Sequence, residues 1–399
     1  VSEDEADVIV LNTCCIRENA DNRLYGALGN LKTLKSERPD IQIAVGGCLA
    51  QKDRELIQQR AKHVDVVFGT HNVQNAVKLL KKSETEGPII EILEELVAED
   101  NEAFPSALPV RREVDHRAWI TLQIGCDNTC TYCIVPSVRG PEISRPFGQL
   151  LDEARSFAEQ GVTEVTLLGQ NVNSYGRDLT KKLKAQNPSK EDAFQVGSLW
   201  LEASSRKIKP LFADLLKTVG SIEGIERVRF ISPHPKDLTL EIVEAMSETE
   251  NVCEHLHLPL QSGSDSILSA MHRGYTSERF LKKVQQARIG IEDLSVTTDL
   301  IVGFPGESEK DFEETLAVVA EAQFDAAYTY IFSPRPGTNA AEMETKFVEH
   351  GIAVRRYETL RDVVKRSSLL KHKERVGRIE EVLVEGRSKK GTDLIKTRT

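Results

Sequence analysis

The chain has 399 residues, 40% of them hydrophobic, so it can bury a sizeable core and is long enough for two or three domains. No apolar run approaches the length of a membrane-spanning helix and the N-terminus lacks the features of a signal peptide, so we expect a cytoplasmic protein with no membrane partner. The net charge of -10 excludes nucleic-acid binding through the overall field, so any RNA contact must come from a local basic patch. Because the sequence does not begin with Met, we expect a fragment of a longer protein.

Residues 1–83 alternate short apolar runs with helical stretches, which is typical of a small parallel α/β sheet. The strands are expected at Val8–Leu11, Ile41–Val45 and Val64–Phe68, and the helices at about 18–35 and 52–62. Cys14 and Cys48 each come just after a strand, which is where open parallel sheets place their sites. Residues 84–111 are expected to be a linker, because eight acidic residues without a lysine or arginine precede two prolines.

Residues 112–345 repeat a unit of one strand followed by one helix, which predicts a (β/α)6 partial TIM barrel. The strands are expected at Trp119–Ile124, Val165–Leu168, Val228–Ile231, His255–Leu260, Val296–Val302 and Ala327–Phe332. The helices are expected at Leu150–Gln160, Leu211–Val219, Leu240–Ser247, Ser277–Ile289 and Glu309–Ala322. A barrel builds its active site from the residues that follow its strands. Here they are Cys126, Gly169, Gln170, Asn171, Ser232, His234, Gln261, Ser262, Gly303, Gly306, Ser333 and Arg335.

Residues 346–375 are expected to be a helical connection, and residues 376–399 to begin a β-domain that is too short to close by itself. From Arg355 to Arg398 there are 14 Lys or Arg and 7 Asp or Glu, a net charge of +7. This stretch is either a basic patch for RNA or a solvated helix face.

Three of the seven cysteines, Cys126, Cys130 and Cys133, lie on one short loop. An odd number of cysteines with such clustering is a poor disulfide framework and points to metal or redox chemistry. Three thiolates on one loop can bind three irons of a 4Fe–4S cluster and leave the fourth iron open to a ligand. The alternative is a zinc site completed by one histidine, but zinc motifs pair their cysteines as C-x2-C and no second pair is present. The candidate histidines are His234, His255 and His257.

The CxxxCxxC spacing, with Tyr132 before the last cysteine and after the first barrel strand, resembles the signature of the radical S-adenosylmethionine (SAM) enzymes. The resemblance implies that SAM chelates the open iron and is cleaved by the reduced cluster to a 5′-deoxyadenosyl radical. The segment Asp299–Glu307 resembles the SAM-binding segment of that family, and its glycines would permit close approach of the cofactor. The cofactor-binding residues implied are Gly169, Gln170, Asn171, Gln261, Ser262, Asp299 and Gly303.

Within that family, Leu11–Cys14 with residues 16–18, and Gly46–Cys48, resemble the N-terminal domain of the methylthiotransferases. There, three cysteines hold a second, auxiliary 4Fe–4S cluster that handles sulfur. Cys14 and Cys48 match two of the three, and we expect the first to lie upstream of this chain. Cys15 stands where the family more often has Ser and is not an expected ligand. Cys253 is expected to be a buried thiol.

Three stretches resemble the branch of the family that acts on N6-isopentenyladenosine at position 37 of tRNA. They are Leu168–Gly176, Ser232–Pro235 and Leu258–Ser264. The resemblance implies methylthiolation at C2 of the adenine, with one SAM giving the radical and another the methyl group, and a base that leaves its stack to react. Implied partners are tRNA, an electron donor such as flavodoxin or ferredoxin, and a sulfur source, with the protein a monomer.

The sequence also allows alternative functions. They are a methylthiotransferase acting on a ribosomal protein or on threonylcarbamoyladenosine in tRNA, and an RNA-binding protein inactive in sulfur insertion. The segment 376–399 resembles the opening of the family's RNA-binding TRAM domain. Residues 177–210 form an insertion with 8 Lys or Arg and 4 Asp or Glu. The insertion is either a grip for tRNA or a tolerated surface loop.

Overall fold

The computed structural model describes residues 5–15, 18–93, 112, 114–185, 193–196, 199–202, 210–388, 391 and 393–399. Residues 16–17, which belong to one of the family-like stretches, lie outside the described part, as does most of the expected linker. No helix in the described ranges is long and apolar enough to cross a membrane.

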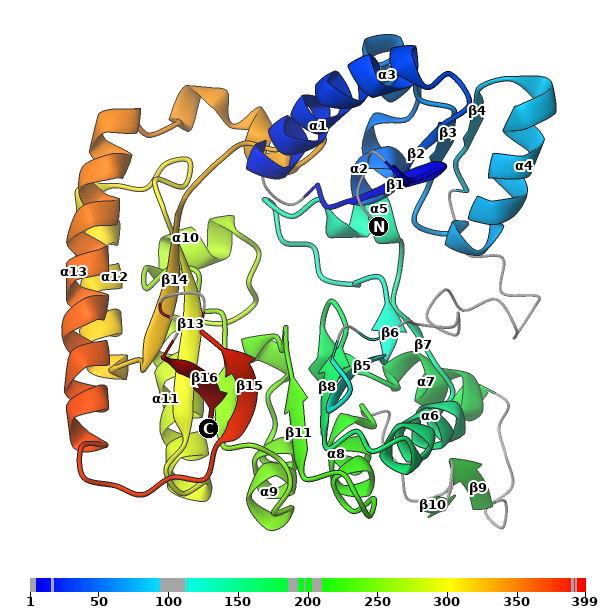
Figure 1. Cartoon of the computed structure of the whole chain (residues 1–399). Coiled ribbons are helices and arrows are strands. Elements are labelled where there is room, and N and C mark those ends of the chain that lie inside the picture. Colours follow the sequence, from blue (N-terminus) through cyan, green and yellow to red (C-terminus); the bar gives the residue numbers. More distant parts are fainter. Residues whose placement is uncertain are drawn as a thin grey trace.

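The N-terminal unit is a parallel sheet in the order β1-β2-β3-β4 (Figure 1). Its strands are β1 (Val8–Thr13), β2 (Gln42–Gly47), β3 (Val66–Phe68) and β4 (Ile89–Glu91). Its helices are α1 (Glu18–Glu37), α2 (Cys48–Asp53), α3 (Glu55–Arg60) and α4 (Ala76–Glu86). Apolar side chains such as Leu28, Ile43 and Leu49 form its core. The three expected strands are confirmed.

Two features of this unit differ from the expectation. The helix expected at 52–62 is broken at Arg54, whose φ of 47° is left-handed, and its first part begins already at Cys48. The beginning of the expected linker is ordered, because α4 runs to Glu86 and β4 pairs in parallel with β3. Strand β4 was not predicted, because it lies within an acidic run and its residues do not alternate clearly between polar and apolar.

The second unit contains six parallel strands, all of which the sequence predicts. One sheet has the order β11-β8-β5 and the other the order β12-β13-β14, and a parallel bridge between Val228 and Val252 lies between them. The strands are β5 (Arg117–Thr121), β8 (Glu164–Leu168), β11 (Arg227–Phe230), β12 (His255–His257), β13 (Ser295–Val302) and β14 (Ala326–Ile331). A short antiparallel hairpin, β6 (Gln123–Ile124) with β7 (Ile143–Ser144), follows β5.

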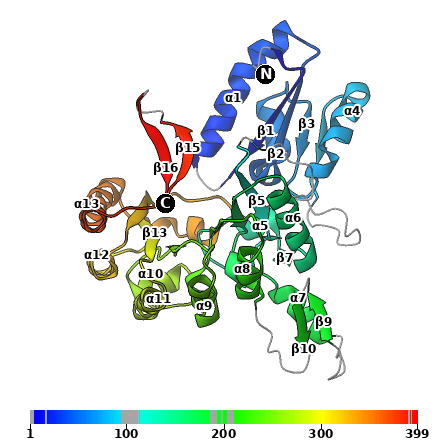
Figure 2. The ribbon, with the colours of Figure 1, turned by 60° about the horizontal axis from the view of Figure 1, so that its bottom comes forward.

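Seen along the strands, the helices form an arc around the outside of the sheets (Figure 2). They are α6 (Phe147–Glu159), α8 (Phe212–Gly220), α9 (Leu240–Glu248), α11 (Ser277–Gly290), α12 (Glu309–Ala322) and α13 (His350–Glu374). Side chains of β13 alternate strictly between buried and half-buried, and the buried ones belong to the core shared with these helices. The other side of the strands, here called the inner face, is more open. Trp119 and Tyr328 are 55% and 59% exposed there.

A short helix joins the two units. Helix α5 (Val135–Arg139) follows Cys133, and its buried Val138, with the preceding Ile134, belongs to the apolar core of the N-terminal unit. The Thr70 hydroxyl donates to the Val138 carbonyl at 2.7 Å. The loop that carries three cysteines is therefore continuous with the interface between the units.

The C-terminal residues form an antiparallel hairpin of β15 (Leu383–Arg387) and β16 (Ile395–Arg398), which starts later than the strand expected from residue 376. It lies on the inner side of the arc (Figure 2). Ion pairs attach it to the first residues of three strands. They are Arg117–Glu385 at 2.9 Å, Arg227–Glu381 at 3.0 Å and Arg398–Glu164 at 3.0 Å.

The insertion contains helix α7 (Arg177–Ala185) and an antiparallel hairpin of β9 (Ala193–Val196) and β10 (Leu199–Glu202). Arg177 is anchored to Asp237 at 2.7 Å. In both views the hairpin lies at the opposite end of the molecule from the N-terminal unit (Figures 1 and 2).

Candidate functional site

The loop Cys126–Cys133 starts directly after β6, at the C-terminal end of the first strand. Gly125 precedes it with a φ of 81°, and a Cβ at this position would lie 1.9 Å from the Pro141 carbonyl oxygen, so only glycine fits. The Cys126 amide donates to the Gly140 carbonyl at 3.1 Å, and the Cys133 amide to the Cys130 carbonyl at 3.0 Å. These bonds fold the loop back on itself, with all three thiols half-buried.

The middle of the loop is fixed to the turn that follows helix α10 (Asp265–Ala270). Thr131 donates from its amide to the Met271 carbonyl at 3.2 Å and from its hydroxyl to the Ala270 carbonyl at 2.9 Å. Tyr132 packs edge-on against Phe304, with 6.5 Å between the ring centroids. The aromatic residue of the motif therefore joins the cysteine loop to the turn after β13.

Two side-chain nitrogen donors among the described residues point at the sulfurs of this loop. The Asn128 amide donates to Cys126 Sγ at 3.5 Å, and the Arg273 guanidinium donates to Cys130 Sγ at 3.2 Å. Lys236 Nζ in turn donates to Asn128 Oδ1 at 2.8 Å. Each of these two donors thus favours negative charge on the sulfur that it contacts.

The protein alone does not keep the Cys126 and Cys133 thiols ionised. Burial, with a smaller contribution from the neighbouring thiol of Cys130, raises the pKa of Cys126 and raises that of Cys133 to about 11. The three sulfurs are therefore close enough to repel one another as thiolates. A bound iron cluster, which coordinates thiolates, would remove this repulsion.

The zinc alternative fits less well. In the described ranges, no three His, Cys, Asp or Glu side chains converge on a point that could hold one metal ion, as tetrahedral zinc requires. A 4Fe–4S cluster has no such need, because each thiolate binds its own iron. Each candidate histidine has a hydrogen-bond partner on at least one ring nitrogen, while His234 Nε2 is buried without one among the described residues. His234 Nδ1 accepts from the Lys236 amide at 3.2 Å, and the rings of His255 and His257 each contact the Thr297 hydroxyl at 3.0 Å.

The seven expected cofactor-binding residues belong to three of the strands and their C-terminal connections, and the structure gives several of them internal partners. Asn171 is buried and donates to Asp237 at 2.9 Å. The Ser262 hydroxyl contacts that of Thr315 at 3.2 Å, and Gln261 has a left-handed φ of 72°. Asp299 lies on the inner face, 3.4 Å from His257 Nε2. Gly169 and Gln170 follow β8, where the Gln170 side-chain oxygen is buried without a protein partner among the described residues.

Gly303 lies close to a helix. Its φ is 71°, and a Cβ there would lie 2.8 Å from Ala353 Cβ of α13, so the close approach is to a helix. Its amide donates to Glu307 Oε2 at 2.7 Å. Glu307 is itself paired with buried Arg356 at 2.8 Å. The residues from Gly303 to Glu307 therefore form a turn that contacts with helix α13 hold in place.

The N-terminal cysteines are close together because their strands are neighbours. Thr13 of β1 pairs in register with Gly47 of β2, so Cys14 and Cys48, each one residue further on, leave adjacent strand ends. A hydrogen bond from Cys15 and the Arg139 guanidinium of α5 lower the pKa of the Cys48 thiol against the opposing effect of burial. An arginine of the joining helix thus reaches the second group of cysteines.

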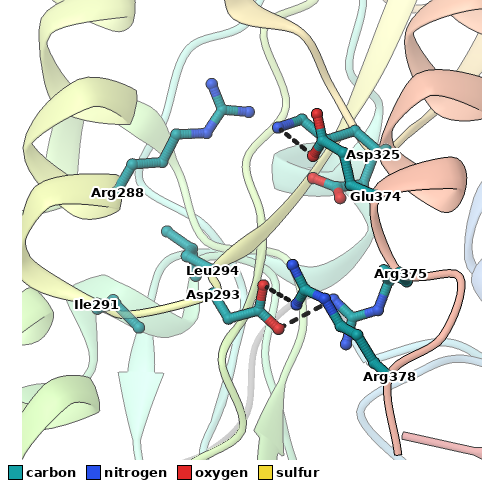
Figure 3. Close-up of a pocket in the computed structure, with 9 residues that line it drawn as sticks. Arg288, Ile291, Asp293, Leu294, Asp325, Glu374, Arg375 and Arg378 are labelled. Carbon is teal, nitrogen blue, oxygen red and sulfur yellow. Dashed lines mark hydrogen bonds and ion pairs between the residues drawn. The ribbon is translucent and has the colours of Figure 1, made fainter.

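A cavity of about 210 Å³ at the other end of the strands belongs to neither group (Figure 3). It lies between the connections that precede β13 and β14 and the end of α13. Asp293 bridges Arg375 at 3.1 Å and Arg378 at 2.9 Å across its rim. Charged pairs fill much of its wall.

Two family models match the chain: the Radical SAM superfamily over residues 120–319, and Uncharacterized protein family UPF0004 over residues 1–69. The tRNA-2-methylthio-N(6)-dimethylallyladenosine synthase of Mycobacterium sp. (strain JLS) is 48% identical over 392 residues, which are 97% of this chain and 72% of that protein. The protein of the same name from Streptomyces coelicolor is 47% identical over 98% of this chain and 71% of its own length. The chain belongs to this family of radical SAM methylthiotransferases.

Among solved structures, the radical SAM methyltransferase TsrM from Kitasatospora setae has the same fold, with a TM-score of 0.55. The two are 14% identical, and the match covers 84% of this chain and 64% of that one. At this identity the likeness speaks for the fold alone.

Membership of the radical SAM superfamily implies a 4Fe–4S cluster and SAM, and the methylthiotransferase family implies an auxiliary cluster. The cysteine loop with its two donors fits the first, and the adjacent pair Cys14 and Cys48 offers two ligands for the second.

Sequence reasoning missed the polar and charged residues that surround the site of this methylthiotransferase: Asn128, Arg139, Lys236, Arg273, Glu307 and Arg356. Most of them contact partners far away in sequence. Arg273 and Cys130, for example, are 143 positions apart. Arg273 lies shortly after a helix and before a glycine, and this local sequence does not indicate a site residue. Only the folded structure reveals its contact with Cys130.

Proposed function

We propose that this protein methylthiolates tRNA, converting N6-isopentenyladenosine at position 37 to its 2-methylthio derivative. The observation that carries the proposal is the joining of two cysteine sites through α5, whose Arg139 reaches Cys48 while the helix itself follows Cys133. A reaction that combines a radical with sulfur transfer needs both sites close to one substrate. Two relatives that align with 97% and 98% of the chain are named for this activity.

The cofactors supply the hard chemistry, which is a carbon-centred radical at adenine C2, sulfur and a methyl group. The work of this chain is to bind, orient and shield. Cys126, Cys130 and Cys133 would hold the SAM-binding cluster, and Cys14 and Cys48 would hold the auxiliary cluster with one further cysteine. Exposed Trp119 and Tyr328 on the inner face offer aromatic surfaces against which an unstacked adenine can lie.

For SAM, we propose contacts with Gly169, Gln170, Asn171, Gln261, Ser262, Asp299 and Gly303. The support is their grouping on three strands and the connections that follow them, where a radical SAM barrel binds its cofactor. Gln170 and Asn171 are the best supported, because each has a buried side-chain oxygen without a protein partner among the described residues. Ser262 would act mainly by shaping the backbone, since its hydroxyl already has a partner in Thr315.

The domain limits follow from the same proposal. The methylthiotransferase N-terminal domain would occupy residues 1–83, the radical SAM core 112–345 as a (β/α)6 partial barrel, and the start of a TRAM-like barrel 376–399, with 84–111 and 346–375 as connections. The ordered β4 at residues 89–91 favours a later end for the first of these. We also propose a cytoplasmic monomer that takes electrons from a flavodoxin or ferredoxin and sulfur from a separate source.

The test is nucleoside analysis of tRNA from a strain that lacks its own 2-methylthio-adenosine synthase and expresses this chain. We expect the 2-methylthio derivative to appear with the parent and to be absent with the variant C126A/C130A/C133A. Anaerobically reconstituted, that variant should contain about four irons fewer per chain than the parent. C253A, which removes a half-buried thiol outside both sites, should match the parent. Unmodified isopentenyladenosine together with a methylthiolated ribosomal protein or threonylcarbamoyladenosine would reject the proposal.

A further inference from the structure

The strongest unexplained feature of the described structure is the environment of Arg273. We propose that Arg273 sets the reduction potential of the cluster held by Cys126, Cys130 and Cys133, through a charged hydrogen bond to the Cys130 sulfur. The inference rests on the proposed function for the presence of that cluster. Arg273 acts through a ligand and is thus a positioning residue.

The guanidinium is held rigidly. Arg273 is only 5% exposed. Nη1 donates to Cys130 Sγ at 3.2 Å, Nε to the Tyr275 hydroxyl oxygen at 3.1 Å and Nη2 to the Pro259 carbonyl at 3.3 Å. The Tyr275 hydroxyl donates onward to the Leu260 carbonyl at 2.9 Å. Each of the three nitrogens has a partner, so the fork cannot turn away from the sulfur without breaking other bonds.

The charge of Arg273 has no ordinary partner. The structure describes four buried arginines, and three of them pair with a carboxylate. These are Arg145 with Glu153 at 2.6 Å, Arg335 with Asp21 at 3.5 Å and Arg356 with Glu307 at 2.8 Å. Arg273 pairs with no carboxylate that the structure describes. Because an uncompensated buried cation is strongly disfavoured, we expect an anion beside it, and Cys130, which would bind iron as a thiolate, is the residue in contact.

Arg273 also differs from the other donor of the loop. Cys126 receives a longer bond from the neutral Asn128 amide, at 3.5 Å. Reduction adds an electron to the cluster, and hydrogen bonds to its sulfurs are one of the factors that set its potential. A cationic donor stabilises the added negative charge more than a neutral one does. The guanidinium therefore raises the potential and makes the cluster easier to reduce.

The test is an EPR-monitored redox titration of the anaerobically reconstituted full chain, without SAM. In R273M the reduction equilibrium constant should fall at least tenfold, which for one electron is about 59 mV towards more negative potential. R273K, which keeps the charge but loses the fork, should lie between R273M and the parent. The matched control is R288M. Arg288 is a half-buried arginine that donates to the Ala322 and Gln323 carbonyls beside the cavity of Figure 3, and its loss should leave the potential unchanged.

Iron and sulfide content separates the possible failures. A parent without a cluster would overturn both the proposed function and this inference. A cluster of normal iron content in R273M with the parent's potential would overturn the inference alone. Should R273M fail to assemble the cluster, R273Q keeps a neutral donor in its place, and a potential equal to that of the parent would again reject the role of the charge.

Discussion

Single residues hold the site by connecting segments that are distant in sequence. Asp311 is an example. Its carboxylate accepts hydrogen bonds from the hydroxyls of Ser264, Ser266 and Ser308, and Ser308 caps α12 in a reciprocal capping box. Through Asp311, the family-like stretch Leu258–Ser264 is tied to the start of α12. Partial burial opposes ionisation, but the hydroxyls of Ser264, Ser308 and Ser266 outweigh it and hold the pKa of Asp311 well below its usual value.

This shift predicts a pH-dependent contribution to stability. Because the pKa of Asp311 is lower in the folded than in the unfolded state, its stabilisation is complete above the unfolded value of about 3.9 and declines as the pH falls below it. D311N should lower the free energy of unfolding by about 1 kcal/mol near neutral pH. Urea denaturation at about pH 6 and at about pH 3 should find the difference between D311N and the parent smaller at the lower pH. A difference that is constant with pH would contradict this account.

At this scale, sequence patterns found the residues whose spacing is fixed by local geometry. Cys126, Cys130 and Cys133 are recognisable because a single loop must present all three. Arg273 and Lys236 are not, because their partners come close only when different strands are assembled side by side. The same holds for Arg139 and Cys48, which lie in different units of the molecule.

At the scale of elements, the turn after β13 is connected to helix α13 by the most deeply buried ion pair that the structure describes at the site. Glu307 accepts from the Gly303 amide and from Arg356, and Arg356 also contacts Glu309 at 3.0 Å. Burial raises the pKa of Glu307, and Arg356 acts against this increase. A charge without its partner here would be costly.

R356M should therefore destabilise the protein by about 3–5 kcal/mol, since it leaves the Glu307 carboxylate buried and unpaired. Chemical unfolding monitored by circular dichroism measures the effect. R355M, on the neighbouring exposed position of α13, is the control and should change stability by no more than about 0.5 kcal/mol. The double variant E307Q/R356M should be less destabilised than the sum of the two single variants, and simple additivity would rule out the pairing.

The strands and helices of the second unit were predictable because apolar runs alternate there with periodic helical stretches, even where a strand is as short as β12. Their positions agree with the expectation in all six strands. The misses include the short elements β4, β7, α5 and α10 and also the eleven-residue helix α4, and β6 is separate from the strand that was expected to include it. The short elements have too few residues to display a period, and tertiary contacts such as Ile134 and Val138 in the N-terminal core decide their structure.

For the molecule as a whole, the position of the insertion argues against a role in gripping tRNA. The hairpin β9–β10 lies at the opposite end from the unit that carries Cys14 and Cys48 (Figure 1). Replacing residues 186–209 by a short Gly/Ser linker should leave both the affinity for tRNA and its salt dependence unchanged. A slope that becomes shallower by about 0.7–0.9 for each phosphate that the protein no longer neutralises would instead assign the insertion to the RNA interface. Binding measured over a range of salt concentrations distinguishes the two.

The short helix α5 has a consequence for how the enzyme handles its substrate. Val138 is part of the N-terminal core, and Cys133 lies only five positions earlier. The N-terminal unit therefore cannot rotate without also moving the cysteine loop. The two cysteine sites must therefore move together as one rigid unit. The anticodon loop, rather than the protein, would then have to deform for the reaction, and a nucleotide already flipped out should be the preferred form of the substrate.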